Sequence, residues 1–137
     1  MVRKIILMGT KISLPDGFHV VWSDEFNSNS INEAIWSCET RAPGWIDGER
    51  QEYCGNKCLD IKDSCLSIRP KITTNSSGEL RYLSGRVSTY GKREYAFGKI
   101  VARVKVPKAN GILSYIRLMP SVSYDEKNGK YKEFPLH

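Results

Sequence analysis

The sequence predicts an all-β fold, and three observations support this class. Two segments, residues 82–89 and 97–106, alternate with the two-residue period of a half-buried strand. A third segment, residues 59–68, has the pattern of a hairpin with one buried side, and no long amphipathic helix accompanies the three. At 137 residues, 40% hydrophobic and 26% charged, the chain is long enough for one core and has no compositional signature of disorder.

Segment 97–106 is predicted to place one of its faces in the core. The core face consists of Gly98, Ile100, Ala102, Val104 and Val106. The opposite face carries the cations Lys99, Arg103 and Lys105, as solvated strand faces commonly do. Because Gly91 supplies a permissive turn between the two alternating segments, we expect 82–89 and 97–106 to pair antiparallel.

The remaining elements are short. In the predicted hairpin 59–68, apolar and polar residues alternate on both sides of a polar turn, and Pro70 ends the second strand. Asn32 can cap a single helical turn that reaches Trp36. Residues 1–16 are a leader of uncertain structure, residues 17–120 hold the strands, and residues 121–137 form a polar loop.

The charge balance is basic, but the cations are scattered. Lysine and arginine exceed aspartate and glutamate by 21 − 15 = 6, and no helix-turn-helix, zinc-finger or RNA-binding signature is present, so nucleic-acid binding is not expected. The apolar run near the N-terminus, Ile5 to Met8, is too short for a signal-peptide core, and no membrane span is expected.

The four cysteines, at positions 38, 54, 58 and 65, allow three pairings. Two disulfides and four buried thiols are both compatible with the sequence. The three-residue gap between Cys54 and Cys58 is not that of a zinc knuckle or a redox motif, and His19 and His137 are remote in the sequence, so a metal site is not expected there.

Four blocks of sequence occur in an order that resembles one enzyme family. They are Val21 to Asn27 with Ile35-Trp36, then Gly44 to Tyr53, then Leu59 to Arg69, and finally SGRVST followed by YAFGKIVARVKVP. Together they are similar to glycoside hydrolase family 16, the laminarinase- and lichenase-like β-glucanases. Blocks in the right order over about residues 18 to 120 are far more specific than any one of them.

The resemblance implies a concanavalin A-like jelly-roll β-sandwich of which the chain holds about the first half, with residues 17–137 as the N-terminal part of the domain. Family members cleave β-glucan with retention through two carboxylic acids spaced Glu-x-Asp-x-x-Glu. That spacing is missing here, and the chain ends where the resemblance would place it. We therefore expect no catalytic residue and no catalytic cofactor in this chain. Open strand edges would favour self-association.

Several residues are candidates for contacts with the polysaccharide. Arg86 matches the arginine of the family's Ser-Gly-Arg strand, which faces the sugar cleft; otherwise it is a surface arginine. Glu49 matches a glutamate near that cleft, although Asp47 and Gly48 replace the asparagines that precede it in the family. Leu113 and Arg117 occupy the positions of two strand tryptophans, and Tyr115 shares their parity as a partial replacement.

Other residues have structural expectations. The tryptophans, Trp22, Trp36 and Trp45, are expected to be buried structural residues. Glu25 matches a glutamate that helps bind structural calcium in some relatives, but calcium needs six to eight oxygen ligands, and one glutamate does not make a site. Family members commonly act outside the cell, whereas no signal peptide is visible, so the localisation stays open.

Three hypotheses about function follow. The chain is part of an endo-acting β-glucan hydrolase, resembling endo-β-1,3(4)-glucanases, and is inactive alone. Alternatively, it is a non-catalytic β-glucan-binding protein of the same fold, which the lost tryptophans would allow. Third, it is a vestigial fragment without activity. In the first two hypotheses the partner is a β-glucan polysaccharide.

Overall fold

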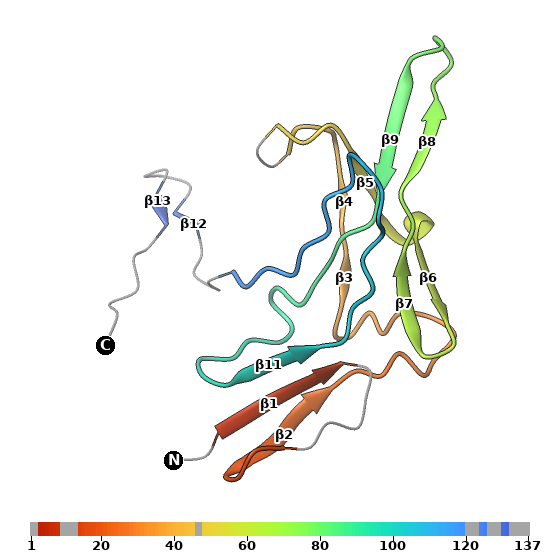
Figure 1. Cartoon of the computed structure of the whole chain (residues 1–137). Helices are drawn as coiled ribbons and strands as arrows, with labels where there is room; N and C mark the ends of the chain where they lie inside the picture. Colours follow the sequence, from red (N-terminus) through yellow and green to blue (C-terminus); the bar gives the residue numbers. More distant parts are fainter. Residues whose placement is uncertain (1–2, 9–13, 46–47, 120–123, 126–129, 132–137) are drawn as a thin grey trace. The chain divides into compact units, whose positions relative to one another are not determined.

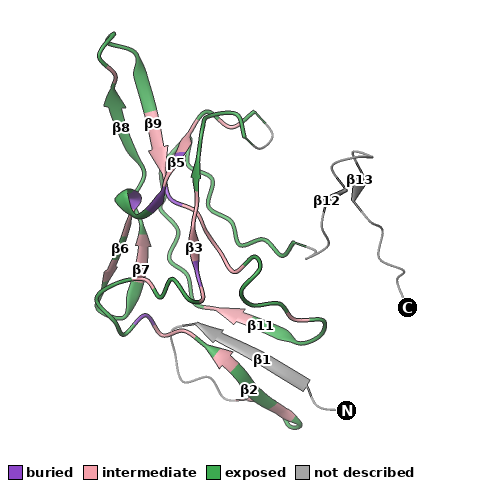
Figure 2. Ribbon diagram, turned by 180° about the vertical axis from the view of Figure 1, so that it is seen from behind, coloured by how far each residue is buried: buried purple, intermediate pink, exposed green. Residues whose placement is uncertain are grey.

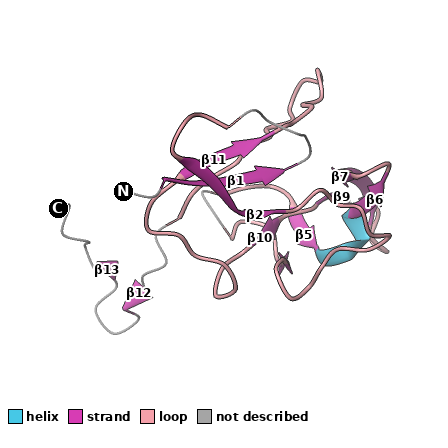
Figure 3. Cartoon of the chain, turned by 90° about the horizontal axis from the view of Figure 1, so that it is seen from below, coloured by secondary structure: helices cyan, strands magenta, loops and turns pink. Residues whose placement is uncertain are grey.

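The structure is a computed structural model that describes residues 3–8, 14–45, 48–119, 124–125 and 130–131 (Figure 1). Strands dominate these residues, and the helical residues among them are those of one short 3-10 helix, η1 (Gly55–Cys58), which follows β5 (Figure 3). The predicted all-β class is confirmed. The chain divides into two units, residues 1–104 and residues 105–137.

The first unit holds eleven of the described strands. They are β1 (Arg3–Met8), β2 (Phe18–Ser23), β3 (Ser37–Cys38), β4 (Thr40–Arg41), β5 (Glu52–Cys54), β6 (Leu59–Lys62), β7 (Cys65–Ile68), β8 (Lys71–Thr74), β9 (Leu80–Ser84), β10 (Val87–Ser88) and β11 (Lys99–Ala102). The second unit holds β12 (Tyr124–Asp125) and β13 (Lys130–Tyr131). In the described part of the chain, no helix is long and apolar enough to cross a membrane.

The first sheet has the order β11-β1-β2, and both of its pairings are parallel. The predicted antiparallel pairing of 82–89 with 97–106 is therefore wrong, because β11 pairs with β1, with Ile100 opposite Ile6. Segment 82–89 is not one strand but divides between β9 and β10, and these strands have other partners. The segment predicted as a leader of uncertain structure thus supplies the central strand of this sheet (Figure 1).

The second sheet has the order β4-β5-β9-β8. β9 pairs antiparallel with β8 and parallel with β5, so that Ser84 lies opposite Tyr53. After two intervening residues, β10 pairs antiparallel with β3, where Val87 lies opposite Cys38. Gly85 and Arg86 therefore lie where the chain passes from one pairing partner to another.

The predicted hairpin 59–68 is confirmed as β6–β7, with Leu59 opposite Ile68. Its two turn residues, Asp63 and Ser64, have φ values of 52° and 53°, as a two-residue turn that matches the twist of the strands requires. β7 ends at Ile68, before Pro70, as expected. The hairpins β6–β7 and β8–β9 follow one another and meet near η1 (Figures 1 and 2).

Few side chains of the described residues are buried (Figure 2). The buried hydrophobic residues are Phe26, Trp36, Tyr53 and Cys58. The predicted core face of 97–106 is wrong for its aliphatic residues, because Ile100, Val104 and Val106 are 40%, 63% and 57% exposed. Alternation predicts a buried face only where a second layer covers the strand, and the described residues of the first unit place none over Ile100 and Val104.

The aromatic residues near the N-terminal end of β3 form the better-packed part. Trp36 stacks on Phe26 with ring centroids 6.0 Å apart and donates its indole N–H to Asp24 Oδ2 over 2.7 Å. Asp24 Oδ1 also accepts the N–H of Phe26, whose φ is 49°. The turn that precedes β3 is confirmed, because Asn32 Oδ1 accepts the N–H of Ala34.

Among the described residues of the second unit, regular structure is limited to β12 and β13. Residues 112–119, predicted to match a strand of the family, form no strand, and all of them are exposed. Within the segment predicted as a polar loop, β12 pairs antiparallel with β13, with Tyr124 opposite Tyr131.

Candidate functional site

An exposed tryptophan ring has two guanidinium groups near it in the first unit. The ring of Trp45 has the guanidinium carbon of Arg41 at 4.8 Å from its centroid and that of Arg86 at 5.0 Å. The residue is 43% exposed, so the expectation that Trp45 is buried is wrong. Trp36 is buried as expected, and Trp22 is half-buried. Cation–π contacts at exposed positions each contribute about 0.5–1 kcal/mol, enough to hold the ring in place.

Tyr53 joins this ring to Glu49. The rings of Trp45 and Tyr53 meet edge to face, with centroids 6.1 Å apart and an interplanar angle of 86°. The Tyr53 hydroxyl donates to Glu49 Oε2 over 2.7 Å and accepts from Gln51 Nε2 at 3.1 Å. The Arg86 guanidinium carbon also lies 5.9 Å from the Tyr53 ring centroid. We call the five residues Arg41, Trp45, Glu49, Tyr53 and Arg86 the Trp45 cluster.

The backbone fixes the position of Arg86. Its carbonyl oxygen accepts the N–H of Glu39 at 2.9 Å, although it lies outside the β3–β10 ladder. The carboxylate of Glu39 pairs with Arg41 at 3.1 Å and accepts the Ser88 hydroxyl at 3.0 Å. One glutamate thus connects both arginines of the cluster.

Gly85 allows the chain to approach the β6–β7 hairpin closely. A β-carbon at this position would lie 2.7 Å from Leu59 Cδ2, 3.0 Å from Ile68 Cγ2 and 3.2 Å from the Cys58 carbonyl oxygen. Real β-carbons essentially never approach as closely as the first of these distances. Only glycine therefore fits without a shift, and this approach places Arg86 next to the end of η1.

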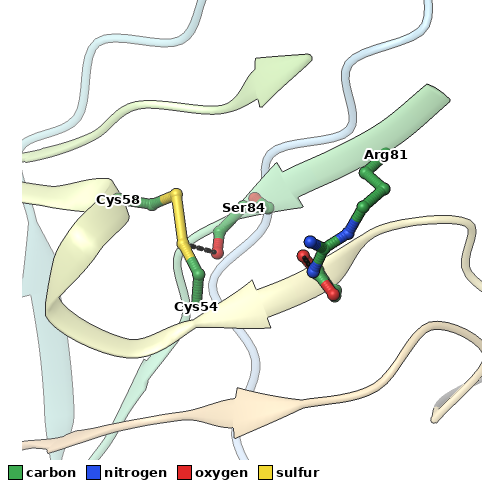
Figure 4. Close-up of polar contacts among 5 residues, drawn as sticks. Cys54, Cys58, Arg81 and Ser84 are labelled. Atoms are coloured by element: carbon green, nitrogen blue, oxygen red, sulfur yellow. Dashed lines mark hydrogen bonds and ion pairs between the residues drawn. A yellow bond between two sulfur atoms is a disulfide. The ribbon is translucent and has the colours of Figure 1, made fainter. Parts of the chain in front are cut away.

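The cysteines match neither of the two expected states. Cys54 and Cys58 form a disulfide, while Cys38 and Cys65 are thiols. Figure 4 shows Cys54 Sγ against the carbonyl oxygen of Ser84 at 3.5 Å; a disulfide sulfur carries no proton, so this is a contact and not a hydrogen bond. Arg81 of β9, labelled in the same view, pairs with Glu52 of β5, and this hydrogen bond raises the pKa of Arg81.

The structure brings together two of the five predicted site residues. Arg86 and Glu49 both contact Tyr53, as described above. Tyr115 and Arg117 lie in the second unit and are exposed. Glu25 is half-buried after β2, and the described residues contain no group of three or more histidine, cysteine, aspartate or glutamate side chains that could hold a metal ion.

Three residues of the cluster were not among the site residues predicted from the sequence: Arg41, Trp45 and Tyr53. In the family block that the segment Gly44 to Tyr53 resembles, the residue expected to contact the sugar is the glutamate. Aromatic residues in a β protein are usually buried, so Trp45 and Tyr53 were not considered as ligand contacts. The concentration of one tryptophan, one tyrosine and three carboxylates within ten residues was the available signal.

This arrangement suits recognition of a neutral polyhydroxylated ligand. An exposed aromatic ring offers an apolar face, a guanidinium fork offers several N–H donors, and a carboxylate offers acceptors. The carboxylates of Glu39 and Glu49 each already accept a hydrogen bond from a hydroxyl. The cluster is therefore equipped to bind a ligand and to orient it.

The comparisons with known proteins point to enzymes that act on glucans. The chain is 25% identical over 121 residues to a glucan endo-1,3-beta-glucosidase A1 of Niallia circulans, covering 78% of this chain and 18% of that protein. It is 26% identical over 106 residues to a beta-glucanase of Rhodothermus marinus, covering 75% of this chain and 36% of that protein. The chain thus spans about a fifth to a third of the length of these relatives.

No family model matches the chain, and no solved structure matches it. The two relatives nevertheless agree in kind, and each alignment covers about three quarters of this chain. The chain is therefore distantly related to bacterial β-glucanases.

Proposed function

We propose that the Trp45 cluster binds β-glucan and that the chain is part of a glycoside hydrolase family 16-like endo-β-1,3(4)-glucanase. The observation that carries this proposal is the exposed Trp45 ring flanked by Arg86 and Tyr53. Sugar rings present axial C–H groups that pack on aromatic faces, while their hydroxyls hydrogen-bond to guanidinium and carboxylate groups. The names of the two relatives support glucan as the ligand class.

The first experiment measures binding of laminarin and lichenan oligosaccharides by isothermal titration calorimetry. Replacing Trp45 by alanine should weaken binding at least about tenfold, which corresponds to roughly 1.4 kcal/mol of lost ring contact. Trp45→Phe keeps an aromatic face and should retain most of the affinity. Phe97→Ala is the matched control, because Phe97 is an exposed aromatic residue of the same unit outside the cluster.

The second experiment tests whether the planar N–H donors of the Arg86 guanidinium group, and not only its positive charge, contribute to binding. Arg86→Lys keeps the cation but loses the planar donors, so binding should weaken about tenfold at unchanged net charge. Arg93→Lys, at an exposed position, is the control. Binding that is equal in all these variants would refute the proposed site. An absence of glucan binding by the wild-type chain would favour a vestigial fragment.

We also propose that this chain alone does not hydrolyse glucan. The sequence contains no Glu-x-Asp-x-x-Glu spacing, so the 137-residue chain should bind glucan without releasing reducing ends. Release of reducing ends from laminarin by the purified chain would contradict this. If the chain extended through any continuing reading frame hydrolyses laminarin or lichenan, the retaining-glucanase assignment is supported.

The second candidate is a non-catalytic β-glucan-binding protein of the same fold. It is favoured by Leu113 and Arg117, which stand where the family has tryptophans. It predicts glucan binding without hydrolysis in every extended version. Tyr115 and Arg117 as sugar contacts stay predictions, which Tyr115→Ala and Arg117→Ala test by the same calorimetry. Calcium at Glu25 stays a prediction, which a calcium titration with Glu25→Gln tests.

A further inference from the structure

We propose that the Cys54–Cys58 disulfide is a redox-sensitive positioning element for the Trp45 cluster, so that reducing it weakens glucan binding. The disulfide begins at the residue after Tyr53. It acts through the backbone that carries Tyr53 on one side and Arg86 on the other. The inference rests on the proposed function, but one of its two measurements requires no ligand.

The disulfide closes the turn that joins β5 to β6. Its Cα atoms are 6.2 Å apart, and the three residues between the cysteines belong to η1. Cys54 follows Tyr53 directly and lies opposite Thr40, the residue before Arg41. The turn is thus continuous with the two strands that carry Arg41 and Tyr53.

The same turn also holds the segment that leads to Arg86. Cys54 Sγ lies 3.5 Å from the Ser84 carbonyl oxygen, and the close approach at Gly85 is to residues at the end of the turn, Cys58 and Leu59. Cys58 is 1% exposed, the lowest value in the described core. Its carbonyl oxygen accepts the N–H of Arg69 at 2.8 Å, which fixes that end of the turn to the β6–β7 hairpin.

Two backbone hydrogen bonds connect the turn to Arg86 through one residue. Gly55, inside the disulfide loop, donates its N–H to the Glu39 carbonyl at 2.9 Å, and Glu39 donates its own N–H to the Arg86 carbonyl at 2.9 Å. A displacement of the turn is therefore passed through Glu39 to Arg86. Arg86 and Tyr53 both contact Trp45, so their relative position determines the geometry of the cluster.

Reduction requires a dithiol as co-reactant, and the step balances. A thiolate of the reductant attacks Cys54 Sγ, because Cys54 is half-buried whereas Cys58 is buried. The S–S bond breaks, Cys58 leaves as a thiolate that takes a proton from water, and the second thiolate of the reductant displaces Cys54. The protein gains two electrons and two protons, and the reductant closes to its own disulfide. The turn then loses its covalent closure.

The first measurement determines glucan affinity at a series of redox potentials. The chain is equilibrated in dithiothreitol buffers of graded ratio, thiols are counted, and laminarin oligosaccharide affinity is measured at each ratio. The count should rise from two to four thiols, because two of the four cysteines are free in the oxidised chain. Affinity should fall at least about threefold with the same midpoint. Cys38→Ser/Cys65→Ser should behave as wild type, and Cys54→Ser/Cys58→Ser should bind weakly at every ratio.

The ligand-free measurement is amide hydrogen exchange. Reduction should speed exchange of the Glu39 and Gly55 amides at least about tenfold, while the β6–β7 amides change little. A merely structural disulfide would instead speed all amides together. Unchanged Glu39 and Gly55 exchange, or equal affinity of reduced and oxidised chains, overturns the inference. If the oxidised chain binds no glucan, the proposed function fails, while the exchange result still decides the positioning role.

Discussion

A single methyl group added at Gly85 tests how closely the chain approaches the β6–β7 hairpin beside Arg86. In Gly85→Ala, the new β-carbon would lie 2.7 Å from Leu59 Cδ2 and 3.2 Å from the Cys58 carbonyl oxygen. Part of the cost is displacing the leucine methyl, which makes the shortest contact, and part is moving away from the carbonyl, which is held by the N–H of Arg69. The segment 84–86 must therefore shift away from the turn.

The expected destabilisation combines two opposing effects. Overpacking by one methyl group typically costs about 1–3 kcal/mol. Gly85 is not among the glycines with positive φ, so alanine also lowers the entropy of the unfolded chain, which stabilises by about 0.4–1 kcal/mol. We expect a net loss of about 1–2 kcal/mol in the free energy of unfolding. Glucan binding should weaken as well, because Arg86 follows directly.

Urea unfolding followed by tryptophan fluorescence measures this loss, and a double-mutant cycle assigns it. Leu59→Val removes Cδ2, so Gly85→Ala should be less harmful in that background, by at least about 0.5 kcal/mol of favourable coupling. A Gly85→Ala variant as stable as wild type, or the same loss in both backgrounds, would show that the close approach is not present. It would also remove the physical reason for the position of Arg86.

Three further predictions concern other parts of the first unit. Asp24→Ala should lower the free energy of unfolding by about 2–3 kcal/mol, measured in urea, because the indole N–H of Trp36 and the N–H of Phe26 both lose an acceptor; a loss under about 0.5 kcal/mol would contradict the role of this carboxylate. Burial raises the pKa of the Cys38 thiol, and nearby Glu33 raises it further. Since the thiolate is the reactive form, iodoacetamide labelling of Cys38 should rise with pH through a midpoint above the usual thiol value, and Glu33→Gln should lower that midpoint; a midpoint at or below the usual value would be contrary evidence. Finally, the exposed aliphatic residues of β8, β9 and β11 should drive self-association that grows with concentration in sedimentation experiments; a monodisperse monomer with cooperative unfolding would refute this.

Local patterns in the sequence predicted local structure well. The hairpin at 59–68 follows from alternation on both sides of a two-residue turn, all within ten residues. The turn capped by Asn32 likewise depends on neighbours in the sequence. In both cases the partners that make the hydrogen bonds are close along the chain, so composition and spacing are sufficient.

Pairing between distant segments was not predictable in the same way. Alternation shows that 97–106 is extended, but it contains no information about the partner, and that partner is β1, more than ninety residues earlier. Burial depends on the second layer, which is why the face with Ile100 was assigned wrongly. The pairing of the cysteines was not predictable either, because four thiols allow three pairings whatever their spacing.

Arg86, one of the residues proposed to bind glucan, lies where the alternation is interrupted, and this explains why alternation alone did not locate it. β9 follows β5 as far as Ser84, and β10 follows β3 from Val87, so Gly85 and Arg86 belong to neither ladder. The carbonyl of Arg86, which lies between the two ladders, accepts the N–H of Glu39. The ladders on both sides fix the position of Arg86. A rigid position outside the ladders is what a ligand-binding arginine requires. The break at Gly85 is therefore the sequence feature that goes with the position of Arg86 in the proposed site.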